Sequence, residues 1–254
     1  MHKHTFLGTL PGFRSVVTLR SWQRASAGDL PAVPVLPETL LLLELEAQES
    51  AVDLRRFSQI ILRDLGATIQ ILRLAGKNWG RSEVPLRIED CISDLGVQAC
   101  LAAMTVRDAS ARRCQDLYAN LWAHSVEVAR YAVLIAEEMH EVNPDQAYLV
   151  GLLHAIGSLP QALGWDDVFS TAENPLMTAF DLANHWGFPG FVQESFHALH
   201  PADRTIPWQE IIRAAHQLVE WSGVGCSFEQ EPHRLHMAVQ NVFQMHGISA
   251  SASN

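Results

Sequence analysis

The sequence predicts an all-α protein, folded as a two-lobed helical bundle. Apolar residues recur three and four positions apart through most of the chain, as they do on one face of a helix. No segment keeps the alternating pattern of a strand for long enough to support a sheet. With 254 residues, 48% of them apolar, the chain is long enough to bury a substantial core.

The first lobe is expected at residues 30–108, after a basic appendage at residues 1–29. Three prolines hold the segment from Leu30 to Pro37 extended, because proline fixes φ and keeps the residue before it out of the α region. A helix should begin directly after this segment. Further short helices are predicted from three apolar stripes: Leu54, Phe57, Ile61 and Leu65; Ile69, Leu72 and Ala75; Ile88, Ile92 and Leu95.

The second lobe is expected at residues 109–246, followed by a tail at residues 247–254. It should open with one long helix from about Arg112 to Glu138, because no proline or glycine interrupts that stretch. We expect this helix to join the two lobes. Its apolar stripe contains Leu117, Leu121, His124, Val128, Tyr131 and Ile135.

The next helix has a clear start signal. Asn143 can cap it and Pro144 suits its first turn, so it should run to Ile156 and stop at Gly157. Three more helices are predicted by similar signals: one that opens at Asn174-Pro175, one over Trp208–Trp221, and one through Val239 and Phe243 that ends at Gly247.

Two histidines are predicted to point into the core. On the long helix, Leu121 precedes His124 by three residues and Val128 follows it by four, so all three lie on one face. His154 follows Gly151 by one turn, and a glycine there permits a close approach of two helices. Two inward histidines on consecutive helices either bind a divalent metal together or satisfy their ring nitrogens separately within the core.

Composition excludes several classes of function. The formal charge of -10 argues against nucleic-acid binding, which needs a basic face. No apolar run approaches the roughly 20 residues that span a bilayer, so we expect no membrane segment. The four cysteines lack the spacing of a zinc or disulfide framework, and we interpret them as reduced, mostly buried thiols of a cytoplasmic protein.

The segment Gly151-Leu152-Leu153-His154-Ala155-Ile156-Gly157 resembles the GLLHDIG signature of HD-type metal phosphohydrolases, with Ala155 in place of the aspartate. In that superfamily an upstream histidine, matched here by His124, joins the His-Asp pair and a later aspartate to hold the metals that activate water. The place of the later aspartate is matched by His216. Ala155 removes a ligand and its negative charge, and a neutral His216 does not restore that charge.

The wider sequence is similar to the HDOD family, the HD-related output domains of bacterial signalling proteins. The resemblance covers residues 30–225. Leu65 departs from it where that family often has proline, and Gly76-Lys77-Asn78 where it often reads Asn-Ser. The matching features are the proline-spaced opening, residues 60–67, residues 71–75, residues 92–96, Trp122-Ala123-His124-Ser125 and Trp186-Gly187-Phe188-Pro189.

The resemblance implies a non-catalytic signal-transduction module that acts through protein-protein contacts. Its partners would be signalling proteins such as cyclic-dinucleotide or two-component modules, and a groove between the lobes would be the default binding site. The alternative is a metal-dependent phosphohydrolase that acts on nucleotides or cyclic dinucleotides.

We expect no catalytic residue, and a degenerate HD site formed by His124, His154, Ala155 and His216. We also expect no cofactor. If a divalent transition metal does bind, zinc, nickel or copper suits neutral imidazoles better than magnesium does. Its ligands would then come from His124, His154, His197, His200 and His216.

Overall fold

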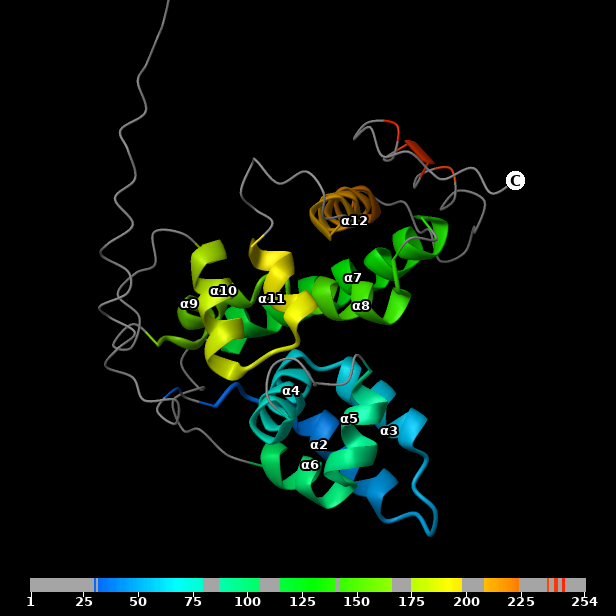
Figure 1. The fold of residues 1–254 in the computed structure, drawn as a ribbon, viewed down its shortest axis with the longest axis vertical. Helices are drawn as coiled ribbons and strands as arrows, with labels where there is room; N and C mark the ends of the chain where they lie inside the picture. Colours follow the sequence, from blue (N-terminus) through cyan, green and yellow to red (C-terminus); the bar gives the residue numbers. More distant parts are fainter. Residues whose placement is uncertain are drawn as a thin grey trace, which may run out of the picture.

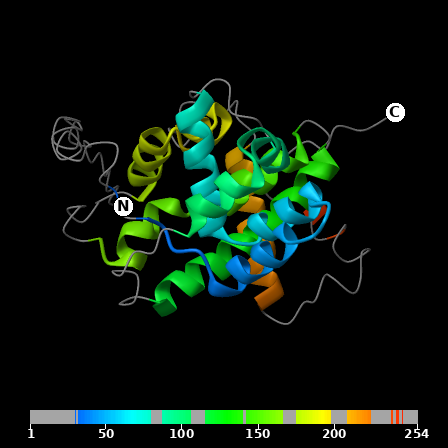
Figure 2. The same ribbon diagram turned by 90° about the horizontal axis from the view of Figure 1, so that it is seen from below.

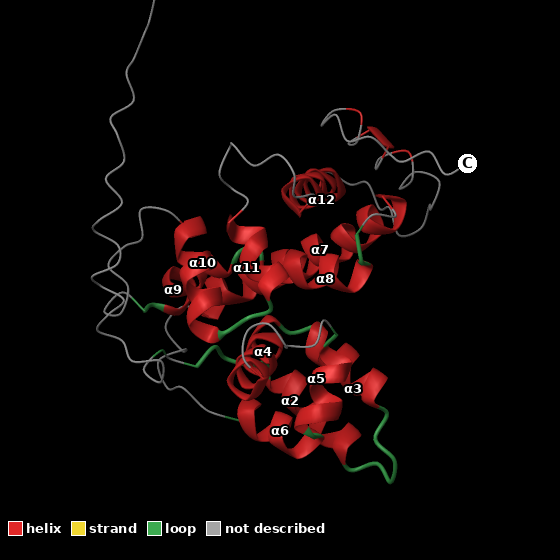
Figure 3. Cartoon of the chain, viewed as in Figure 1, coloured by secondary structure: helices red, strands yellow, loops and turns green. Residues whose placement is uncertain are grey.

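The computed structural model describes residues 30, 32–79, 87–105, 115–139, 142–165, 175–197 and 208–223, together with residues 237, 240, 241 and 244. Within these ranges the chain forms helices and loops and contains no strand (Figure 3). The all-α prediction is confirmed. The predicted appendage and the tail lie outside the described residues. Val239 and Phe243 of the last predicted helix also lie outside them, but residues 237, 240, 241 and 244 of that stretch are described and are helical.

The helices form two groups that are stacked on each other (Figure 1). The view from below places the N-terminal group in front of the C-terminal group (Figure 2). The predicted boundary between residues 108 and 109 falls in a part of the chain that the structure does not describe. The N-terminal group contains α2 (Pro37–Ala47), α3 (Leu54–Leu62), α4 (Leu65–Trp79), α5 (Ile88–Leu95) and α6 (Val97–Met104). The C-terminal group contains α7 (Gln115–Met139), α8 (Pro144–Leu153), the 3-10 turn η2 (Ile156–Ser158), α9 (Leu159–Leu163), α10 (Pro175–Trp186), α11 (Gly190–His197) and α12 (Trp208–Gly223).

The proline-spaced opening is extended, as predicted, and α2 begins at Pro37. Asp64 fixes this segment, because its carboxylate accepts the backbone N–H of Leu36 at 2.8 Å. The same carboxylate accepts the N–H of Ala67 at 3.0 Å and so caps the N-terminus of α4. Gly66 lies directly against the opening, since a Cβ at this position would overlap the carbonyl oxygen of Pro34. Burial raises the pKa of Asp64, against the effect of these hydrogen bonds.

The long helix α7 is present with nearly the predicted ends. Val128 and Ile135 are fully buried, but Leu117 is 53% exposed, so its place on the buried stripe is wrong. The first turn of α7 instead buries Tyr118, whose hydroxyl donates to the carbonyl of Pro34 at 2.8 Å. Neighbouring residues on a helix point about 100° apart, so burying Tyr118 turns Leu117 outward.

The helix with the clear start signal, α8, begins as predicted and ends early. Asn143 caps it by accepting the N–H groups of the first turn. The helix ends at Leu153 rather than Ile156, because His154 and Ala155 form a turn that leads into η2. This turn buries Ile156 and Leu159 completely, and burial of these side chains outweighs the propensity to continue the helix.

The two groups share one hydrophobic core. A single cluster of buried residues runs from Phe57 and Ile61 in the N-terminal group to Leu182 and Phe188 in the C-terminal group. A second cluster packs α7, α8 and α12 against one another. Cys91 and Cys100 are buried in the N-terminal group, as expected, and Cys114 and Cys226 lie outside the described residues. Among the described helices, none has the length and apolarity needed to cross a membrane.

Candidate functional site

Three histidines from three helices converge in the C-terminal group. His124 lies on α7, His154 follows the last residue of α8, and His216 lies on α12. Their ring centroids are 5.3 Å apart for His124–His154, 4.9 Å for His124–His216 and 4.8 Å for His154–His216. One ring nitrogen from each lies within 4.8 Å of the other two. We call these residues the histidine trio.

Small residues let the three helices approach closely enough to form the trio. A Cβ added to Gly151 would lie 2.7 Å from the Cα of Ala129, so glycine is required for this approach of α8 to α7. On α12, Ala214 and Ala215 are fully buried beside His216. The histidine spacing therefore depends on helix contacts that leave no room for larger side chains.

His154 has a defined tautomer. Its Nδ1 lies 2.6 Å from the carbonyl oxygen of Gly151. A carbonyl oxygen can only accept, so Nδ1 carries the proton and donates it. In the neutral ring, Nε2 then has a free lone pair and is the nitrogen available to bind a ligand.

The environment favours neutral imidazoles. Burial lowers the pKa of His154 to about 3, and the hydrogen bond to Gly151 opposes this shift only in part. Burial also lowers the pKa of His216, and a charge on His124 lowers it further. Neutral imidazole is the form that binds metal ions.

Within the part of the chain that the structure describes, no carboxylate joins the trio. Among the described histidines, cysteines and acids, the three histidines are the one group placed to share a metal ion. Ala155 occupies the turn directly after His154, with φ -101° and ψ 13°, where the resemblance calls for an aspartate. Glu220, which is exposed one turn beyond His216 on α12, raises the pKa of His216 against the larger effect of burial.

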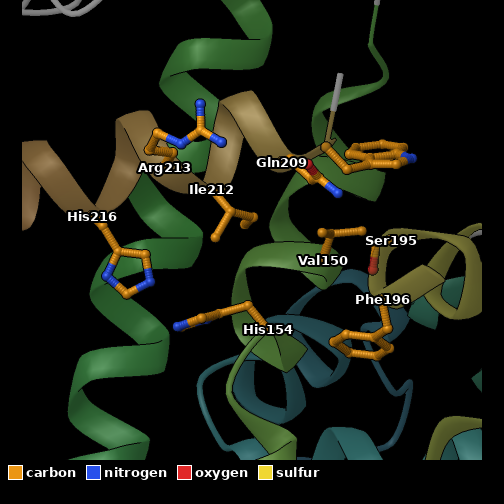
Figure 4. Close-up of a pocket in the computed structure, with 9 residues that line it drawn as sticks. Val150, His154, Ser195, Phe196, Gln209, Ile212, Arg213 and His216 are labelled. Carbon is orange, nitrogen blue, oxygen red and sulfur yellow. The ribbon is translucent and has the colours of Figure 1, made fainter. Parts of the chain in front are cut away.

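A cavity of about 250 Å³ adjoins the trio. It lies between α8, α11 and α12, and Figure 4 shows the side chains of His154 and His216 pointing into the same space. Its lining is mainly apolar, and the guanidinium of Arg213, another lining residue, points away from His154 and His216 (Figure 4). The amide nitrogen of Gln209 is buried and has no hydrogen-bond partner among the described residues, so the cavity offers one free donor.

This cavity differs from the expected groove between the lobes, because it lies within the C-terminal group. Gln209, Ile212, Arg213 and His216 share one face of α12, so helical spacing from His216 could have identified them. Ser195 and Phe196 come from α11, and no local signal links them to the histidines.

Two other histidines were named as candidate ligands. The backbone of His197 ends α11, but its side chain lies outside the described part of the chain, as does all of His200. The structure therefore brings together His124, His154 and His216, with Ala155 beside them.

Comparison with solved structures identifies proteins of the same fold. The MmoQ response regulator of Methylococcus capsulatus matches in two structures at 19% identity, with TM-scores of 0.64 and 0.60. The match with a TM-score of 0.64 covers 86% of this chain and 98% of the MmoQ chain. The match with a TM-score of 0.60 covers 83% of this chain and 91% of the MmoQ chain. A virulence factor of Campylobacter jejuni matches at 17% identity with a TM-score of 0.56, over 86% of this chain and 87% of its own.

No curated protein is similar enough to the chain to be matched with it. The family comparison gives a match to the HDOD domain over residues 33–178, which is more than half of the chain. This range includes His124 on α7 and the turn formed by His154 and Ala155, and it ends before α12. The chain therefore belongs to the HDOD family.

Proposed function

We propose that the protein is a non-catalytic adaptor of bacterial signal transduction that acts through protein-protein contacts. The observation that carries this proposal is the absence of a carboxylate from the histidine trio within the described residues. Phosphohydrolase chemistry needs metal ions that activate water, and acidic ligands offset the charge of those ions. Ala155 supplies neither a ligand atom nor a charge.

The family and the solved relatives support a signalling role. The HDOD match covers the turn that carries Ala155, and the MmoQ protein of the same fold is described as a response regulator. A two-component receiver domain is therefore the partner class that we propose first. Cyclic-dinucleotide signalling proteins are the second class.

The described surface has one feature suited to protein contacts. Leu41, Leu42 and Leu45 lie next to one another on α2 and are 58%, 51% and 54% exposed. Single exposed leucines are common, but a group of them on one helix often marks an interaction surface. We call these residues the leucine row.

The first experiment measures hydrolysis. Wild-type protein is assayed against nucleotides and cyclic dinucleotides with Mg²⁺, Mn²⁺ and Zn²⁺, and we expect no turnover. Ala155→Asp supplies the missing carboxylate, and Ala155→Asn is its neutral control of the same size. Wild-type turnover that His154→Ala abolishes would show that the protein is a phosphohydrolase and would overturn the proposal.

The second experiment measures binding to purified receiver domains and cyclic-dinucleotide proteins from the same cell. Leu42→Glu should weaken binding by at least about tenfold, because a charge would be buried in an apolar contact. Gln98→Glu makes the same neutral-to-acidic change at an exposed position of α6 and should leave the affinity unchanged. Absence of binding to every module tested would contradict the adaptor function.

A further inference from the structure

We propose that the histidine trio binds one divalent transition-metal ion of the zinc type through three imidazole nitrogens. This site is independent of the adaptor function, because it needs neither a partner nor a reaction. It also differs from the acid-containing site that the HD phosphohydrolase resemblance implies, since all three ligands are imidazoles.

The geometry of the trio fits a single small ion. Zinc binds histidine nitrogen at about 2.0–2.1 Å, which places the nitrogens of a tetrahedral site roughly 3.3–3.4 Å apart. The candidate nitrogens of His124, His154 and His216 already lie within 4.8 Å of one another. Binding of one ion therefore requires side-chain rotations that bring these nitrogens closer together.

His154 is already oriented as a metal ligand. Its Nδ1–H donates to the carbonyl oxygen of Gly151, which leaves Nε2 free toward the other two histidines. Metal-binding histidines almost always donate their second N–H to a carboxylate, a backbone carbonyl or a water, because this hydrogen bond fixes the ring and raises its basicity. The Gly151 carbonyl has this role whether or not an acid follows at residue 155.

The ligand set predicts which ion binds. Three imidazoles suit Zn²⁺, Ni²⁺ and Cu²⁺, whereas Mg²⁺ requires oxygen ligands that the trio does not offer. The cavity beside His154 and His216 leaves space for a water molecule as a fourth ligand. Three histidine nitrogens and one water molecule would then complete a tetrahedral coordination shell.

The test is calorimetric titration of Zn²⁺ into full-length, chelator-treated protein that carries no affinity tag. We expect one Zn²⁺ per chain, a higher Tm with Zn²⁺ and no response to Mg²⁺. His216→Gln should weaken binding by more than about 100-fold, because losing a ligand costs more than losing the hydrogen bond that supports one. Co²⁺ serves as a spectroscopic probe, since its visible absorption depends on coordination geometry.

The matched control is His185→Gln on α10, which removes a half-buried histidine that is not part of the trio. It should retain full affinity, which would show that loss of a histidine outside the trio does not by itself weaken binding. Circular dichroism of each chelated variant checks that it is folded. The proposal is overturned if wild-type protein binds no Zn²⁺, or if folded His216→Gln and His154→Gln bind it as tightly as wild type. Hydrolysis by the zinc-bound protein would overturn the adaptor function and leave the metal site in place.

Discussion

At the scale of single residues, the neighbours His154 and Ala155 differ in what they contribute to the histidine site. The carbonyl of Gly151 orients the ring of His154 and fixes its tautomer. Ala155 brings no polar side-chain atom to the same turn. The site thus keeps an oriented imidazole, and residue 155 does not provide an acid that would stabilise charge beside it.

The lowered pKa of His154 predicts how stability depends on pH. The unfolded chain binds a proton at His154 below its ordinary pKa of 6.5, whereas the folded chain binds it only near pH 3. Between these values the unfolded state holds more protons, so stability falls as pH falls from about 6.5 toward 3. The slope from this one group is no more than about 1.4 kcal/mol per pH unit.

Urea unfolding of chelator-treated protein at several pH values between 4 and 7 measures this slope. His154→Gln should make it shallower, because the variant has no imidazole to protonate at this position. His216 contributes in the same direction, so some slope should remain. An identical slope in wild type and His154→Gln would show that the His154 pKa is not lowered.

At the scale of elements, the C-terminus of α3 is capped by side chains from the other helix group. The Leu62 carbonyl accepts the hydroxyl of Tyr148 on α8 at 2.9 Å, and the Arg63 carbonyl accepts the indole N–H of Trp122 on α7 at 2.8 Å. The last carbonyls of a helix have no partner within it, so these contacts satisfy groups that would otherwise lack one. They also fix the position of α3 relative to α7 and α8.

Removing one of these caps should destabilise the protein modestly. Tyr148→Phe keeps the ring and deletes only the hydroxyl, so the free energy of unfolding should fall by about 0.5–1.5 kcal/mol. Chemical denaturation measures the loss. Tyr131→Phe on α7 is the control variant, because it deletes a tyrosine hydroxyl that is not part of this contact. A Tyr148→Phe variant as stable as wild type would mean that water satisfies the Leu62 carbonyl equally well.

At the scale of the whole molecule, α4 of the N-terminal group lies against the end of α10 in the C-terminal group. A Cβ on Gly76 of α4 would overlap the carbonyl oxygen of Gly187, which follows α10 with a φ of 69°. Beside this contact the guanidinium of Arg73 lies 5.3 Å from the ring centroid of Trp186. A larger residue at position 76 would therefore require the backbone of Gly187 to move.

Gly76→Ala should therefore separate the two groups and destabilise the protein by about 1–3 kcal/mol, the usual cost of overpacking a close contact. Urea denaturation measures the change. Gly190→Ala is the matched control, because a Cβ at Gly190 meets nothing within 4 Å and this residue begins α11 without a positive φ. The free energy of unfolding of Gly190→Ala should equal that of the wild type or exceed it slightly. Equal losses in both variants would show that the Gly76–Gly187 contact has no special role.

The helical class, the extended proline opening and the starts of α8 and α10 could be predicted from the amino-acid sequence. These features depend on local chemistry: proline geometry, an Asn143 cap and apolar spacing. Local chemistry also predicted that His124 and His154 point inward, because helical periodicity fixes the face on which each residue lies.

Tertiary packing was needed to find where α8 ends and that Leu117 is exposed. It also gives the physical reason why His216, which the HD resemblance had matched to this site, meets the other two histidines. Burial of Ile156 ends α8 early, and burial of Tyr118 turns Leu117 outward. His216 is distant in sequence from His154, and the packing of α12 on α7 and α8 brings them together. Such contacts depend on how whole helices pack against one another, and the spacing of residues along a single helix does not predict that packing.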